Sequence, residues 1–234
     1  MYMELVKPPS DKELANWIKH DSGLPWLMLD MKLPWEKMLQ EVEALEEDDW
    51  IHYRPYSSNG GWSVSILHGL EKRPYNWEYY AKEEGWTSAE DAPNIFTEVS
   101  KKCPFMMDYI VNVLGIKQQE RTRIMRLAPG GVINLHHDRK KNDDPLTRDI
   151  MKLTTLHFSI TNPDECDFVI PHWGRIPARN GDVFLFDNKW EHYLINNSDK
   201  PRYHIIFNGA VWQNDFWNRE VIKGWDKFKE YYNK

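Results

Sequence analysis

The second half of the chain is a succession of short strand-like stretches, and this pattern constrains the fold most. The stretches are rich in β-branched and aromatic residues and cover 121–127, 132–137, 151–160, 167–170, 183–186, 192–195 and 202–211. Turn formers such as Pro129-Gly130-Gly131 and Asn180-Gly181-Asp182 separate them. Short strands without intervening helices favour antiparallel sheets over βαβ units. We therefore predict a mostly β fold with flanking helices and a sandwich or jelly-roll core.

Helical patterns are predicted before and after this region. Apolar residues recur at helical spacing, with capping or stop residues at the ends, in segments that begin near Ser10, Trp35, Trp77, Pro104 and Trp217. Gly85 and Gly115 are expected to end the third and fourth helices. Residues 50–56 and 62–68 are predicted to form a hairpin across the turn at 57–61.

The length favours a single domain, because 234 residues are enough for one sizeable core and too few for two. Within residues 1–234 we expect a mainly helical cover with early strands over 1–118. The β core is expected over 119–212, and a C-terminal helix over 213–234.

The composition limits which binding partners and which cellular compartment are expected. The formal net charge is -6 and no dense basic run is present, which argues against nucleic acid as a partner. We find neither a signal peptide nor an apolar run long enough for a membrane span, so no membrane partner is expected. The two cysteines, Cys103 and Cys166, do not make a disulfide framework. A reducing, cytoplasmic location is therefore predicted.

The most specific chemical signal is the pair His136 and Asp138. On a β-strand, residues two apart point to the same face, roughly 7 Å apart along the backbone. An imidazole and a carboxylate so placed suit a metal, although a lone pair of this kind is a weak signal. His192 would complete a set of two histidines and one carboxylate. That set leaves coordination positions open and is associated with non-haem Fe(II) oxygenases.

Arg202 adds a fixed cation to this set. The turn-rich residues 196–201 predict a hairpin between the strands on either side of them, which would place His192 opposite Arg202. A guanidinium there could hold a carboxylate at two points while the metal chelates the other end of the same molecule. 2-Oxoglutarate has the required group at both ends.

These residues also carry a family resemblance. The segment from Arg126 to Asp138 reads RLAPGGVINLHHD and resembles the RLxPGxxIxxHxD block of the aspartyl/asparaginyl β-hydroxylase-like family of Fe(II)- and 2-oxoglutarate-dependent oxygenases. Residues 156–163, 181–188, 196–198 and 202–204 resemble the strands that follow in that family, in the same order. The resemblance is specific over about 103–208 and weak before that.

The resemblance implies a double-stranded β-helix, a jelly roll of the cupin type. It implies Fe(II) on His136, Asp138 and His192, and O2 as the other co-substrate. It implies 2-oxoglutarate on Arg202 and His157. Thr155, two positions before His157, is a further candidate for co-substrate binding, although the family usually has an arginine there. The chain also departs from the family at Asn208, where an acidic residue is frequent. Because Asp138 is present, the resemblance favours hydroxylation over halogenation.

Substrate-binding residues are a further prediction. Arg123 and Arg126 lie on one predicted strand and face opposite sides, and either could hold a substrate carboxylate or make an ordinary ion pair. Trp62 and Trp190 are candidates for the wall of the pocket. His204 shares the strand face of Arg202, so it is either a pocket residue or a structural histidine.

The predicted function is hydroxylation of a small amino-acid-like molecule, because the length is accounted for by one barrel and its helices. An alternative is hydroxylation of aspartyl, asparaginyl or other side chains in a polypeptide. A second alternative is a cupin-like metalloprotein without oxygenase activity, or a ligand-sensing module; Arg202 and the complete triad argue against it.

Overall fold

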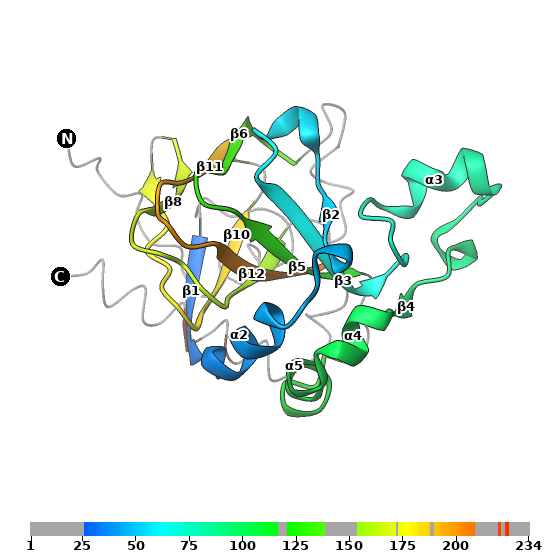
Figure 1. The fold of residues 1–234 in the computed structure, drawn as a ribbon, viewed down its shortest axis with the longest axis horizontal. Helices are drawn as coiled ribbons and strands as arrows, with labels where there is room; N and C mark the ends of the chain where they lie inside the picture. The colour runs from blue at the N-terminus through cyan, green and yellow to red at the C-terminus, as the bar shows by residue number, and fades with distance from the viewer. Residues whose placement is uncertain are drawn as a thin grey trace.

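The described part of the computed structural model comprises residues 26–116, 121–138, 154–171, 173–187, 190–208, 220 and 223–224. Its centre is formed by two antiparallel sheets, with helices against the larger one (Figure 1). The larger sheet has the strand order β1 (Trp26–Lys32), β10 (Asp182–Asp187), β7 (Thr154–Ser159), β12 (Arg202–Asn208), β5 (Arg121–Leu127), β3 (Trp62–Gly69) and β2 (Ile51–His52), with β4 (Ile95–Phe96) also paired to β3. The smaller sheet has the order β6 (Val132–His136), β11 (His192–Asn196), β8 (Cys166–Ile170) and β9 (Gly174–Arg175).

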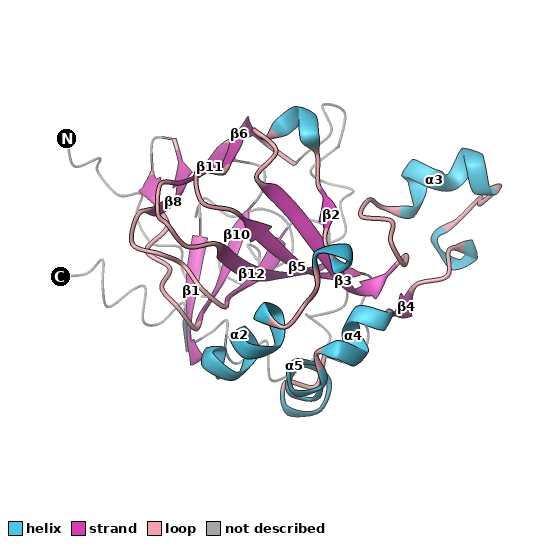
Figure 2. Ribbon diagram, in the orientation of Figure 1, coloured by secondary structure: helices cyan, strands magenta, loops and turns pink. Residues whose placement is uncertain are grey.

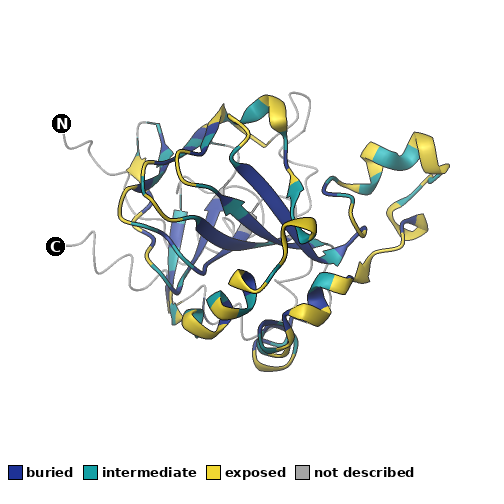
Figure 3. Cartoon of the chain, in the orientation of Figure 1, coloured by how far each residue is buried: buried dark blue, intermediate teal, exposed yellow. Residues whose placement is uncertain are grey.

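The larger sheet separates two hydrophobic cores because its side chains alternate between its faces. On β12, Tyr203, Ile205 and Phe207 contribute to the core shared with the helices. On β10, Phe184 and Phe186 instead contribute to the core between the sheets, together with Phe168 of β8. Figure 3 shows the central strands as the most buried part of the molecule. The inner face of the larger sheet is therefore where a buried site can form.

Helices cover the outer face of the larger sheet (Figure 2). They are α2 (Trp35–Glu43), α4 (Glu98–Lys102) and α5 (Pro104–Asp108), which continues into a π-helical turn, η4 (Tyr109–Val113). Helix α3 (Trp77–Glu84) instead projects away from the sheets. Short 3-10 turns are η1 (Glu47–Asp49), η2 (Pro55–Ser57) and η3 (Ala89–Asp91).

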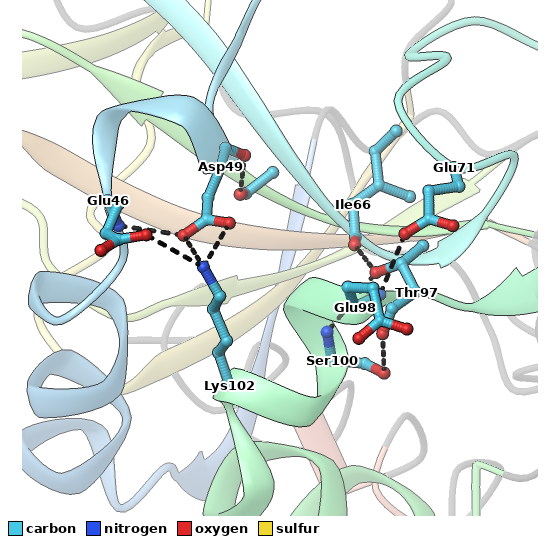
Figure 4. A network of polar contacts seen from close by, with 9 residues as sticks. Glu46, Asp49, Ile66, Glu71, Thr97, Glu98, Ser100 and Lys102 are labelled. Carbon is cyan, nitrogen blue, oxygen red and sulfur yellow. Dashed lines mark hydrogen bonds and ion pairs between the residues drawn. The ribbon is translucent and has the colours of Figure 1, made fainter.

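Polar contacts tie α4 to the rest of the fold (Figure 4). The Thr97 hydroxyl accepts a bond from the Ser100 amide at the start of α4, and it donates to the Ile66 carbonyl of β3. At the other end of the helix, Lys102 Nζ lies 2.8 Å from Asp49 Oδ1. Both ends of α4 are thereby fixed to neighbouring segments.

Most predicted elements are present. The fold prediction of a mostly β protein with flanking helices and a double-stranded β-helix core is confirmed. The helices predicted from Trp35, Trp77 and Pro104 begin at those residues. The strand predicted over 121–127 has those bounds, and β2 and β3 pair as expected. The helices predicted near Ser10 and Trp217 lie outside the described residues, apart from a few positions, and the single-domain assignment stays a prediction.

The predicted hairpin between His192 and Arg202 is wrong. Strand β11 pairs with β6 and β8 in the smaller sheet, whereas β12 pairs with β5 and β7 in the larger one. The segment between them therefore crosses from one sheet to the other. His192 and Arg202 face each other across the sandwich, and Phe168 contacts both, with its ring 5.6 Å from the His192 ring and 5.8 Å from the Arg202 guanidinium carbon.

One other prediction needs correction, and one strand was not predicted. The strand expected over 50–56 ends at His52, because Arg54 adopts a left-handed conformation and η2 follows. Strand β1 was not predicted, although it pairs with β10 at one edge of the larger sheet.

Within the described residues no helix is both long and apolar enough to cross a membrane.

Candidate metal centre and co-substrate pocket

Three predicted ligands converge at one end of the sandwich. His136, Asp138 and His192 each offer a ligand atom, and these atoms all lie within 4.8 Å of one another. The two histidines are opposite each other in the β6 and β11 register, with ring centroids 4.3 Å apart. Strand pairing thus places two of the candidate ligands, and the chain just past β6 supplies the third.

Local hydrogen bonds orient both imidazoles for a metal. His136 Nδ1 lies 2.7 Å from the Asn134 carbonyl, and His192 Nδ1 lies 2.9 Å from the Trp190 carbonyl. Because a carbonyl oxygen only accepts, each Nδ1 carries the proton. A neutral ring then has its lone pair on Nε2, which can bind a metal. This is the usual arrangement of metal-binding histidines, in which the second nitrogen donates to a backbone or carboxylate oxygen.

The environment keeps His192 neutral. Burial and, to a smaller extent, the neighbouring His136 lower the pKa of His192 to about 4, while Asp138 opposes the shift. For Asp138, burial raises the pKa, but His192, Arg54 and His136 together hold it below its usual value. A neutral imidazole and an ionised carboxylate are the forms that bind a metal.

Asp138 reaches the site differently from the sequence-based prediction. Strand β6 ends at His136, so Asp138 is not held on the strand face by sheet pairing. Its Oδ1 lies 3.8 Å from His136 Nε2 and 3.4 Å from Arg54 Nη1. Sequence reasoning missed Arg54, because no motif connects it to Asp138.

The predicted co-substrate arginine is completely buried on the inner face of the larger sheet. Arg202 Nε donates to Asn162 Oδ1 at 2.8 Å, and Nη1 lies 2.7 Å from His204 Nδ1. Burial lowers the pKa of Arg202. Arginine is nevertheless not deprotonated in proteins, so the guanidinium stays charged. Its contacts with Asn162 and His204 set its orientation.

Several buried polar atoms beside Arg202 have no hydrogen-bond partner among the described residues. They are Arg202 Nη2, both ring nitrogens of His157, and the Ser159 hydroxyl. Leaving such a group unpaired costs about 1–3 kcal/mol, and native structures rarely do so without a reason. A dicarboxylate with one end near Nη2 would satisfy the guanidinium. The residues present therefore fit 2-oxoglutarate.

The His157 side chain is held between aromatic rings. It stacks on Phe184 at 4.9 Å and on His204 at 5.4 Å. Burial and the Arg202 charge lower the pKa of His157 to about 3, and burial with Arg202 lowers that of His204 well below its usual value. Both rings are therefore neutral near pH 7 and can lie beside Arg202 without charge repulsion.

The two candidate substrate arginines lie on opposite faces of β5, as the alternation predicts. Arg126 faces outward, where it contacts both Glu47 carboxylate oxygens at 3.0 and 2.7 Å. Arg123 is buried on the inner side, and its Nη1 donates to the Tyr53 hydroxyl at 3.0 Å. The structure thus brings Arg123, and not Arg126, to the face that carries the site.

The remaining candidates are distributed around the site. Trp62 lies beside the triad, with its ring 6.4 Å from that of His136, and its buried Nε1 has no hydrogen-bond partner among the described residues. Trp190 packs edge-on against Trp173 at 5.8 Å. His204 contacts Arg202, as described above. Thr155 occupies the β7 position opposite Phe186 of β10, and its co-substrate role stays a prediction.

Comparison with known proteins identifies a family match. A family model described as aspartyl/asparaginyl beta-hydroxylase matches residues 32–212. A comparison with curated proteins found no significant match.

Solved structures that are similar to this chain include a 2OG-Fe(II) oxygenase family protein and two prolyl hydroxylases. A 2OG-Fe(II) oxygenase family protein from Burkholderia pseudomallei has 12% identity and a TM-score of 0.47, over 90% of this chain and 98% of that one. A Pseudomonas putida prolyl-4-hydroxylase has 12% identity and a TM-score of 0.46, over 85% and 98%. A prolyl hydroxylase from Trichoplax adhaerens, in complex with a hypoxia-inducible-factor peptide, has 12% identity and a TM-score of 0.46, over 84% and 87%.

Proposed function

The chain belongs to the aspartyl/asparaginyl β-hydroxylase family, and from this premise we propose that it hydroxylates a small, amino-acid-like molecule. It is an Fe(II)- and 2-oxoglutarate-dependent dioxygenase that uses O2. In our proposal His136, Asp138 and His192 hold the iron, while Arg202 and His157 hold 2-oxoglutarate. The observation that most supports 2-oxoglutarate binding at this site is the unpaired, buried Arg202 Nη2.

When bound, the iron supplies the redox chemistry that couples decarboxylation of 2-oxoglutarate to insertion of oxygen into a C–H bond. The residues of this chain bind and orient. Asn162 and His204 fix the Arg202 guanidinium, and the aromatic residues Phe168, Phe184 and Phe186 exclude water around it. Holding both reactants in place and keeping water out is the main contribution of the protein.

A small carboxylate-bearing substrate is supported by the charges beside the triad. Arg123 is buried on the inner face of β5, and Arg54 lies at the metal end. Burial raises the pKa of Tyr53, but Arg123, Arg54 and Arg121 outweigh it and lower the value. This positive field favours an anion, and the unpaired Trp62 Nε1 supplies a neutral donor nearby.

Hydroxylation of a polypeptide side chain is the second candidate. It is favoured by the family description, which refers to aspartyl and asparaginyl residues. The exposed side chains of Tyr56 and Tyr79 could contact a longer substrate. We expect no nucleic-acid or membrane partner, and we propose a cytoplasmic location.

A substrate panel separates the two candidates. Free amino acids and short peptides are incubated with Fe(II), 2-oxoglutarate and O2, and succinate release is measured together with a product heavier by one oxygen atom. We expect turnover of a free carboxylate-bearing amino acid and loss of that turnover in Arg123→Gln. Turnover of peptides alone would overturn the small-molecule proposal, and no substrate-dependent succinate from either class would overturn the hydroxylase proposal.

A further inference from the structure

Arg54 combines an unusual backbone conformation with a contact to a predicted metal ligand. Its φ of 45° and ψ of 63° lie in the left-handed region, which residues with a Cβ rarely adopt. Pro55 follows directly, and a residue before proline is normally extended. Among the described residues, Lys72 is the only other non-glycine residue with a positive φ. Such strain persists where surrounding contacts enforce it, and it often marks functional sites.

The surroundings of Arg54 hold it firmly on one side. Its guanidinium lies over the Tyr53 ring, 5.4 Å from the centroid. Tyr53 is buried, its amide donates to the Trp62 carbonyl at 2.9 Å, and its hydroxyl accepts from Arg123. The Trp62 ring meets the Tyr53 ring edge-on at 4.6 Å. Arg54 therefore rests on a fixed aromatic surface and is not a freely moving surface side chain.

The loop that carries Arg54 is also attached to strand β6, which carries the candidate ligand His136. Ser58 forms an isolated bridge with Ile133 of β6. The Asn59 side chain donates to the Gly130 carbonyl and accepts from the Val132 amide, both at 2.8 Å. Because Asp138 follows two residues after the end of β6, this attachment holds the segment with Arg54 beside the segment with Asp138.

We propose that Arg54 is a positioning residue for Asp138. Sheet pairing ends at His136, so the carboxylate that completes the triad lies where the backbone alone does not fix its orientation. The Arg54 Nη1 atom, 3.4 Å from Asp138 Oδ1, supplies a charge-assisted contact that keeps the carboxylate turned toward the two histidines. Partners of this kind orient metal-binding side chains and strengthen metal binding. The inference rests on the proposed function because it takes the triad as the metal site.

An ordinary surface ion pair would not account for these observations. The Arg54 and Asp138 side chains are 38% and 35% exposed, and exposed pairs usually contribute little to stability. Such a pair would give no reason to retain a left-handed arginine before a proline. A requirement to place the guanidinium beside the third ligand does give one.

The test uses Mn(II) as a redox-stable probe of the full-length, metal-free protein. Mn(II) affinity is measured by titration, and stability by thermal melting, for Arg54→Gly, Arg54→Lys and the control Lys72→Gly. Glycine removes the side chain and also relieves the backbone strain. We therefore expect Arg54→Gly to bind Mn(II) roughly 10–100-fold more weakly while melting no lower than the wild type. Arg54→Lys should lose less affinity, and Lys72→Gly should bind as the wild type does.

Three outcomes would overturn the inference. Arg54→Gly could bind Mn(II) as tightly as the wild type. Arg54→Gly and Arg54→Lys could both lose Mn(II) and also melt well below the wild type, which would make the residue structural. The wild type could fail to bind Mn(II) at all. If instead the wild type binds Mn(II) with the expected variant effects but releases no succinate with any substrate, the proposed function fails and the role of Arg54 stands.

Discussion

The two ends of the candidate site are fixed by different means. At the co-substrate end, Arg202 and His157 lie on central strands of the larger sheet and are buried. At the metal end, Asp138 lies past the end of β6 and its side chain is 35% exposed. Strand register specifies the first end, whereas a contact from a distant loop specifies part of the second. Substitutions at the co-substrate end should therefore be poorly tolerated. Metal binding at the other end should depend on contacts to the ligands, such as that of Arg54 with Asp138.

Removal of a ligand at the metal end should have the largest effect. His192→Ala deletes one of the two imidazoles that sheet pairing places opposite each other. Loss of a residue that only contacts a metal ligand lowers metal affinity by roughly 10–100-fold. Loss of His192 itself should lower it by more, and succinate release should drop to background. His137→Ala, a change at an exposed neighbouring position, is the control. A His192→Ala enzyme that turns over normally would show that the ligand set is wrong.

At the co-substrate end, the charge of Arg202 should decide 2-oxoglutarate affinity. A hydrogen bond to a charged group contributes about 1.5–3 kcal/mol, so Arg202→Ala should raise the 2-oxoglutarate dissociation constant by roughly 10–100-fold. His157→Ala should raise it less. Affinity is measured anaerobically on Mn(II)-loaded protein, with Arg175→Ala as an arginine control. Circular dichroism checks that each variant folds, and unchanged affinity in a folded Arg202→Ala would place the co-substrate elsewhere.

The pH dependence of stability should reflect the buried histidines of the co-substrate end. Burial lowers the pKa of His157 to about 3, from its usual value of 6.5. Between these values the unfolded chain binds more protons than the folded protein, so acid favours unfolding. Stability should be highest above about pH 6.5 and should fall toward pH 4, by up to roughly 1.4 kcal/mol per pH unit for each such imidazole.

Thermal melts of metal-free protein at pH 7, 6 and 5 measure this slope. His157→Phe keeps the aromatic stacking on Phe184 and removes the titrating group, so its slope should be smaller than that of the wild type. An equal slope in the variant would mean that His157 is not responsible.

The smallest effect is expected outside both ends. Arg126 faces outward and pairs with Glu47, whose side chain is 77% exposed. Arg126→Gln should therefore leave metal affinity, 2-oxoglutarate affinity and turnover as in the wild type, in contrast to Arg123→Gln. Steady-state kinetics with the substrate found in the panel compare the two variants. A larger loss of turnover in Arg126→Gln than in Arg123→Gln would mean that the wrong face of β5 has been assigned to the substrate.

The sequence predicted the elements better than the connections between them. The bounds of β5 were predicted correctly, and so were its two faces, because side chains alternate along a strand. The turn between β11 and β12 was misread, because a turn-rich segment has the same composition whether it closes a hairpin or crosses between sheets. Strand β1 was missed because its sequence, WLMLDMK, contains no β-branched residue.

The same contrast holds in the site. His136, Asp138 and His192 could be predicted because ligand chemistry and strand positions agree, and the structure brings them together. Arg54 could not, since it lies 84 positions before Asp138 and adopts a conformation that its residue type disfavours. Tertiary packing, rather than local propensity, places it.

The central claim is that one triad and one buried arginine together make a site for iron and 2-oxoglutarate. Isothermal titration of 2-oxoglutarate into anaerobic wild-type protein, with and without one equivalent of Fe(II), tests it most directly. The account predicts one 2-oxoglutarate per chain, with affinity that rises when Fe(II) is present and with no such rise in His192→Ala. Binding that is the same with and without Fe(II), or a rise that persists in His192→Ala, would contradict it.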